Sequence, residues 1–180
     1  MLGFIKNLFG QKKKDDLVSV TKKILADMHS IEEYANFVAT NVDDCSKGFE
    51  TSFDYHQNDN IYIVLANIFA KFSDDLQFNE QEEDYHQQIL MLILVRYEGM
   101  DKQSRWNEFI ESISYFENKL ASIDMSSKTP GEYLFTLCSQ YAQYLYPKNE
   151  AHDLLAQTMY LTQWVPVIAV LAKEQKRFYS

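Results

Sequence analysis

Apolar residues recur at helical spacing along most of the chain. The clearest case is residues 101–124, where the period of three to four residues marks one helical face. The apolar positions there are Trp106, Phe109, Ile110, Ile113, Phe116, Leu120 and Ile123. Thr129-Pro130-Gly131-Glu132 is a capping box with proline at the first helical position, so the next helix is predicted to begin there and to end before Pro147. A last helix is expected from Asn149 to about Arg177, with a kink at Pro166.

Residues 15–43 are predicted to form one long helix. Its apolar positions repeat every seven residues, as Leu17, Ile24, Ile31 and Val38, with a companion series of Met28, Ala35 and Val42. This spacing resembles a coiled coil, but it barely spans the minimum of about three to four heptads, so an ordinary bundle helix is favoured. Residues 44–58 lack periodicity and contain Gly48, which indicates a loop.

The centre of the chain is the most hydrophobic part. Residues 59–76 are apolar on nearly every side, as expected of a buried helix. Residues 80–98 begin with acids and amides and continue into the apolar run 89–95, whose leucines and flanking pattern favour a second helix over a strand. Together they predict a central hydrophobic hairpin. The whole chain is predicted to be all-α, a single-domain bundle of five or six helices.

Composition agrees with this fold class. The chain has 180 residues, which suits one domain, and only 5 glycines and 3 prolines. Both residues are used freely in all-β folds, and Rossmann-like folds need glycine at phosphate-binding turns. Their scarcity therefore favours long helices joined by few loops.

Charge divides the chain into two parts, a segment 1–14 and an all-helical domain 15–180. The first fourteen residues contain four lysines and no acid, so the remainder carries a net −13 against −9 for the whole chain. A body this acidic repels nucleic acid, which requires clustered Lys and Arg. It suits a basic protein partner.

The segment 1–14 is basic and amphipathic. Its apolar residues Leu2, Phe4, Ile5, Leu8 and Phe9 share a broad helical face, and its cations are Lys6, Lys12, Lys13 and Lys14. Such a segment either lies weakly on an anionic membrane surface or packs on the acidic body. Its charge order is the reverse of a secretory signal, so we expect a cytoplasmic protein, with a place at the inner face of the membrane as an option.

Candidate catalytic chemistry is sparse. Glu83 and His86 form one Glu-x-x-His unit of the kind used in pairs by di-iron bundles, but no second unit exists, so a hydrogen-bonded or solvated His86 is preferred. Cys138 lies on an apolar helix side, and Cys45 is expected in the loop, where Asp43 and Asp44 would raise its pKa. No catalytic residue, metal site or cofactor is therefore predicted, and the protein is expected not to be an enzyme.

The remaining candidate site is acidic and rich in tyrosine. Its members are Asp43, Asp44, Glu50, Asp54, Tyr55, Asp59, Glu82, Glu83 and Tyr85. Acids with interleaved tyrosines suit a basic protein target. The leading hypothesis is a non-enzymatic protein-binding protein, immunity- or inhibitor-like, that occupies a basic partner. The alternatives are a membrane-surface adaptor tethered by residues 1–14 and a metal-dependent helical-bundle enzyme centred on Glu83 and His86.

Overall fold

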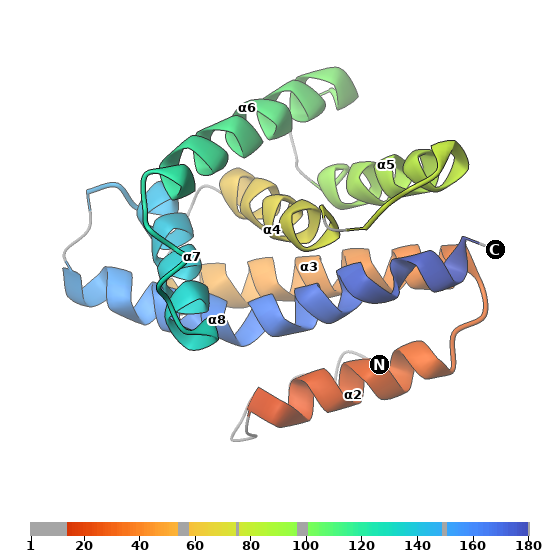
Figure 1. Cartoon of the computed structure of the whole chain (residues 1–180), viewed down its shortest axis with the longest axis horizontal. Coiled ribbons are helices and arrows are strands. Elements are labelled where there is room, and N and C mark those ends of the chain that lie inside the picture. Colours follow the sequence, from red (N-terminus) through yellow and green to blue (C-terminus); the bar gives the residue numbers. More distant parts are fainter. Residues whose placement is uncertain (1–13, 54–57, 75, 97–100, 149–150, 180) are drawn as a thin grey trace.

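The computed structural model describes residues 14–53, 58–74, 76–96, 101–148 and 151–179, and these contain helices and no strand (Figure 1). The described residues form seven α-helices and one short 3₁₀ helix. In chain order they are α2 (Lys14–Ala26), α3 (Ile31–Phe53), α4 (Asn58–Ser73), α5 (Glu80–Leu94), α6 (Lys102–Ala121), α7 (Pro130–Leu145), α8 (Ala151–Glu174) and η1 (Gln175–Phe178). The all-α prediction is confirmed, whereas the expected number of five or six helices is too low.

Two helices, α4 and α8, form the centre of the bundle. Helix α8 packs against α2, α3, α4 and α7, while α4 also contacts α3, α5, α6 and α7. In Figure 1 α3 and α8 run side by side through the middle, with α2 below them, α6 above α4 and α5 to the right of α4. The predicted central hairpin is therefore right for α4 and wrong for α5. The first half of α5 is polar, so this helix buries only His86 and four apolar residues near its end.

The predicted helix 15–43 is interrupted between α2 and α3. Ser30 precedes α3 and caps its start. Its Oγ accepts a hydrogen bond from the Glu33 backbone N–H at 3.1 Å, and the Glu33 carboxylate accepts one from the His29 N–H at 2.9 Å. These two bonds satisfy donors that would otherwise be unpaired at a helix start. The sequence contains this signal as Ser30-x-x-Glu33, but the heptad spacing across it favoured a continuous helix.

The predicted loop 44–58 is also wrong over most of its length, because α3 continues to Phe53. The buried residues Val42, Cys45 and Phe49 keep the three-to-four-residue period. Gly48 lies inside this helix, next to the hydroxyl of Tyr160 from α8. A larger side chain has no room there, so the glycine reflects helix packing and not a turn.

The remaining helix boundaries follow their sequence signals. Thr129 and Glu132 form the predicted capping box of α7, with Pro130 at its first turn.

By length and composition alone, Asp153–Phe178 could cross a membrane, with a mean hydropathy of 1.4. In this fold the segment packs against four other helices and buries Gln157, Thr158 and Gln175, which suits a core helix.

Candidate functional site

The predicted acidic residues fall into two separate groups. Asp43, Asp44 and Glu50 lie along α3, whereas Glu82, Glu83 and Tyr85 lie in the first two turns of α5. The start of α5 contacts Tyr179 and Lys176 at the end of the chain, and Phe178 beside them stacks on Tyr34 near the start of α3. Since an α-helix rises about 1.5 Å per residue, Asp43 lies about 14 Å further along α3 than Tyr34. The fold therefore does not merge the two groups.

The α3 group is largely engaged within the protein. Tyr62 donates a hydrogen bond to Asp43 at 2.7 Å, and Lys47 forms an ion pair with the same carboxylate. Burial alone would raise the pKa of Asp43, but these two partners lower it. Burial and the neighbouring Asp43 raise the pKa of Asp44. Asp43 thus acts as an acceptor that links α3 to α4.

The start of α5 carries more free charge. Asn79 and Glu82 form a capping box, in which the Glu82 carboxylate accepts from the Asn79 N–H at 2.9 Å. Lys176 lies 3.4 Å from the same carboxylate. Three further acids, Glu80, Glu83 and Asp84, have no cationic partner among the described residues. The helix dipole stabilises carboxylates at this position, which explains how they are tolerated together.

Aromatic rings lie beside these acids. Tyr85 stacks on Tyr179, with ring centroids 5.3 Å apart and an angle of 23° between the planes. Tyr179 donates a hydrogen bond to Gln175 Oε1 at 2.6 Å, which fixes the ring. Burial first, then the charges of Glu82 and Glu83, raise the pKa of Tyr179.

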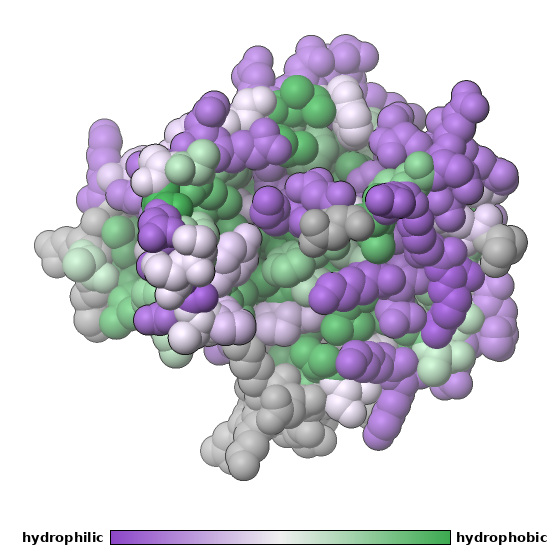
Figure 2. All heavy atoms as spheres, in the orientation of Figure 1, coloured by the Kyte–Doolittle hydropathy of each residue, from purple (hydrophilic) through white to green (hydrophobic). Residues whose placement is uncertain are grey.

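We call this set the α5 acidic surface, and it comprises Glu80, Glu82, Glu83, Asp84, Tyr85 and Tyr179. Hydrophilic side chains cover most of the visible face over α5 (Figure 2). Sequence reasoning identified Glu82, Glu83 and Tyr85 but missed Tyr179. Tyr179 lies far along the chain, and only the packing of η1 brings it to α5.

His86 occupies a buried hydrogen-bonding network. Its Nδ1 lies 3.1 Å from Gln175 Oε1, and Gln175 Nε2 donates to Ser73 Oγ at 3.0 Å. Because Oε1 only accepts, Nδ1 carries the proton. The ring also stacks on Phe78 and Phe69, with centroids 5.0 and 6.0 Å away. The prediction of a hydrogen-bonded His86 is confirmed.

Lowering the pH is expected to destabilise the fold through protonation of His86. Burial lowers the pKa of His86 below its usual 6.5, although Gln175, Glu83 and Asp74 act in the opposite direction. As the pH falls below about 6.5, the unfolded chain takes up the proton more readily than the folded one, so the free energy of unfolding decreases. Denaturant unfolding between about pH 7.5 and 5.5 measures this. His86→Phe keeps the stacking and should reduce the pH dependence; an unchanged dependence would contradict the assignment.

The two cysteines are both buried, Cys45 in α3 and Cys138 in α7. The expected position of Cys45 in a loop is therefore wrong, because Cys45 lies inside α3. Burial, followed by the neighbouring Cys138 and Asp44, raises the pKa of the Cys45 thiol. A protonated, enclosed thiol is a poor nucleophile.

Several of the predicted site residues are not described by the structure. The segment residues Leu2, Phe4, Ile5, Lys6, Leu8, Phe9, Lys12 and Lys13 lie outside the described residues, as do Asp54, Tyr55 and the side chains of Lys14 and Asp59. Within the described ranges, no three His, Cys, Asp or Glu side chains gather to hold a metal ion. A cavity of about 380 Å³ between α4, α6 and α7 was not indicated by any sequence motif.

No family model, curated protein or solved structure matches the chain. The functional argument therefore rests on the helical fold and on the geometry of its surface.

Proposed function

We propose that the protein is a non-enzymatic binding protein, immunity- or inhibitor-like, that occupies a basic protein partner through the α5 acidic surface. The supporting observation is the combination of three carboxylates without a cationic partner among the described residues and a stacked tyrosine pair beside them. Lys and Arg of a partner would supply the missing counter-charges.

The two kinds of side chain contribute differently to binding. Exposed carboxylates accelerate association and select against acidic partners, but each surface ion pair adds little affinity. Tyrosines supply contact area at low entropic cost. Tyr85 and Tyr179 are half-buried and already stacked, so little further ordering is needed when a partner covers them.

The α3 group is less suited to this role. Asp43 is already bound by Lys47 and Tyr62, so a partner would have to displace these contacts. The α5 acidic surface is therefore the better candidate of the two.

A matched pair of charge variants tests the proposal. Glu80→Gln, Glu83→Gln and Asp84→Asn together remove three negative charges from the α5 acidic surface. Asp27→Asn, Glu32→Gln and Glu111→Gln together remove the same charge from exposed positions elsewhere. Each triple variant and the parent are expressed at native level and purified at low salt. We expect parent and control to retain one basic partner at a fixed ratio, and the α5 variant to lose at least about tenfold in affinity.

Two results would contradict the proposal. One is recovery of the parent protein alone under these conditions. The other is equal retention of the partner by the α5 variant and the control. Circular dichroism of the α5 variant shows whether its helix content is kept, because the removed acids also interact favourably with the helix dipole.

A further inference from the structure

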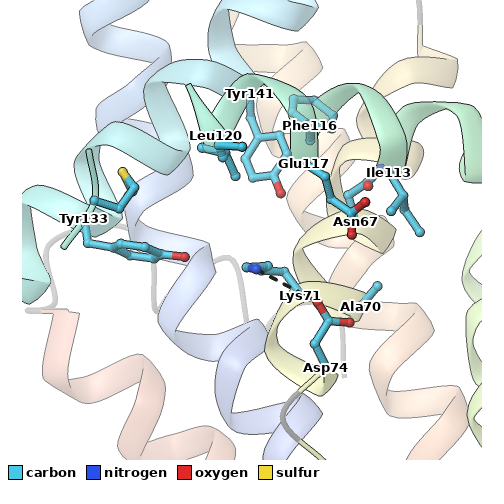
Figure 3. A pocket seen from close by; sticks show the side chains of 12 residues that line it. Asn67, Ala70, Lys71, Asp74, Ile113, Phe116, Glu117, Leu120, Tyr133 and Tyr141 are labelled. Carbon is cyan, nitrogen blue, oxygen red and sulfur yellow. Dashed lines mark ion pairs between the residues drawn. The ribbon is translucent and has the colours of Figure 1, made fainter. Parts of the chain in front are cut away.

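The cavity between α4, α6 and α7 has an apolar wall and a polar rim (Figure 3). The apolar wall consists of Ala70, Ile113, Phe116, Leu120, Ala121 and Met125. Its volume of about 380 Å³ falls within the range of small-molecule sites in proteins. Three helices contribute to it, so its shape depends on the tertiary fold.

One tyrosine hydroxyl opens into this cavity and has no hydrogen-bond partner among the described residues. Tyr141 is 1% exposed, yet its hydroxyl points into the cavity in Figure 3. No described residue forms a hydrogen bond with this hydroxyl, whereas the hydroxyls of the buried Tyr34 and the half-buried Tyr160 each donate to a backbone carbonyl. A hydroxyl that faces a cavity and has no protein partner there can donate to a molecule that occupies the cavity.

The chemistry around Tyr141 restricts the ligand at the inner end of the cavity. Burial raises the pKa of Tyr141, so its hydroxyl stays protonated and available as a donor. The nearby Asn67 amide nitrogen already donates to Ile63 O and Ser112 Oγ, which leaves its carbonyl oxygen as an acceptor. Removing a charged group from water against such walls is far more costly than removing a neutral oxygen, whose smaller cost a hydrogen bond from Tyr141 offsets.

The rim restricts the charge of the ligand further. Lys71 and Asp74 lie 4.0 Å apart at the rim, and Glu117 lies opposite on α6. These three side chains sum to one negative charge, which disfavours an anion. The Tyr133 ring also borders the opening and offers an aromatic face.

We propose that this cavity binds a small, uncharged molecule with an apolar ring, whose hydroxyl oxygen accepts a hydrogen bond from Tyr141. A phenolic hydroxyl fits best, because it accepts from Tyr141 and has a proton to donate to an acceptor on the wall. This site lies on other helices than the α5 acidic surface and does not depend on the function proposed for that surface.

The probe for this site is p-cresol, compared with toluene and benzoate, each titrated into the full chain and followed by calorimetry and by NMR. Toluene lacks the oxygen, and benzoate carries the disfavoured charge. We expect saturable binding of p-cresol, weaker by at least about fivefold in Tyr141→Phe, which corresponds to one hydrogen bond. The control Tyr115→Phe removes the hydroxyl of an exposed tyrosine on α6 that does not line the cavity, and should bind p-cresol as the parent does.

A second variant guards against a folding defect in the first. Ala121→Trp fills the cavity from the exposed end of its apolar wall and should abolish p-cresol binding while the helix content is kept. The proposal is overturned if p-cresol shows no saturable binding to the parent. It is also overturned if Tyr141→Phe binds p-cresol as tightly as the parent, if benzoate or toluene binds as well as p-cresol, or if the folded Ala121→Trp variant still binds it.

Discussion

Tyr34→Ala is expected to lower the free energy of unfolding by about 3–5 kcal/mol, the usual range for losing a large buried aromatic side chain. Tyr34 on α3 is 0% exposed, and its ring stacks on Phe178 with centroids 4.6 Å apart. Its hydroxyl donates to the Leu171 carbonyl at 2.5 Å. The side chain therefore connects α3 to the end of α8 and to η1. Denaturant unfolding at neutral pH measures the loss.

Two further variants separate the contributions. Tyr34→Phe keeps the ring and removes the hydrogen bond, so it should cost about 1 kcal/mol. Phe135→Ala removes an aromatic ring that is 41% exposed on α7, and should change stability by less than about 1 kcal/mol. If Tyr34→Ala were no more destabilising than Phe135→Ala, the described contact between α3, α8 and η1 would be wrong.

Gly48→Ala is expected to destabilise the protein by about 1–3 kcal/mol, although alanine favours a helix over glycine by about 1 kcal/mol. A Cβ atom at position 48 would collide with the hydroxyl of Tyr160. That ring cannot move freely, because it packs edge-on against Phe49 and Phe53 with centroids 5.6 Å away in both cases. Thermal and denaturant unfolding of the purified variant provide the measurement.

The chain offers both a control and a rescue for this prediction. Gly131 in α7 has no atom within 4 Å of its added Cβ, so Gly131→Ala should be neutral or stabilising. Tyr160→Phe removes the colliding oxygen and loses its bond to the Cys45 carbonyl. In that background Gly48→Ala should no longer destabilise. An equally large loss with and without the Tyr160 hydroxyl would rule out the collision as the cause.

Periodicity predicted the helices well and their ends less well. The amphipathic pattern of α6 and the capping box of α7 are local signals, and both were read correctly. The boundary between α2 and α3 depends on two hydrogen bonds of Ser30 and Glu33, which compete with an uninterrupted heptad pattern. In the sequence Gly48 indicates a loop. Its actual role is to leave room for the Tyr160 hydroxyl, and the sequence does not show this because Tyr160 lies on another helix.

The candidate sites could also be predicted only where their residues are close together in the sequence. The acids that open α5 could be found from the sequence, since carboxylates favour a helix start. Their aromatic neighbour Tyr179 and their counter-charge Lys176 come from the end of the chain, and no local pattern connects them to α5. The cavity that receives the Tyr141 hydroxyl is formed by α4, α6 and α7 together. Residues joined only by tertiary packing are not predictable from spacing.

Zero-length carbodiimide crosslinking in extracts of the native cell, followed by mass spectrometry, tests the proposed function most directly. This reagent joins a carboxylate to a lysine that contacts it, without a spacer. We expect Glu80, Glu83 or Asp84 to be joined to lysines of one basic protein, with these links lost in the Glu80→Gln, Glu83→Gln, Asp84→Asn variant. Crosslinks to a partner only from acids elsewhere, such as Asp43 or Glu111, or no crosslinked partner, would contradict the account.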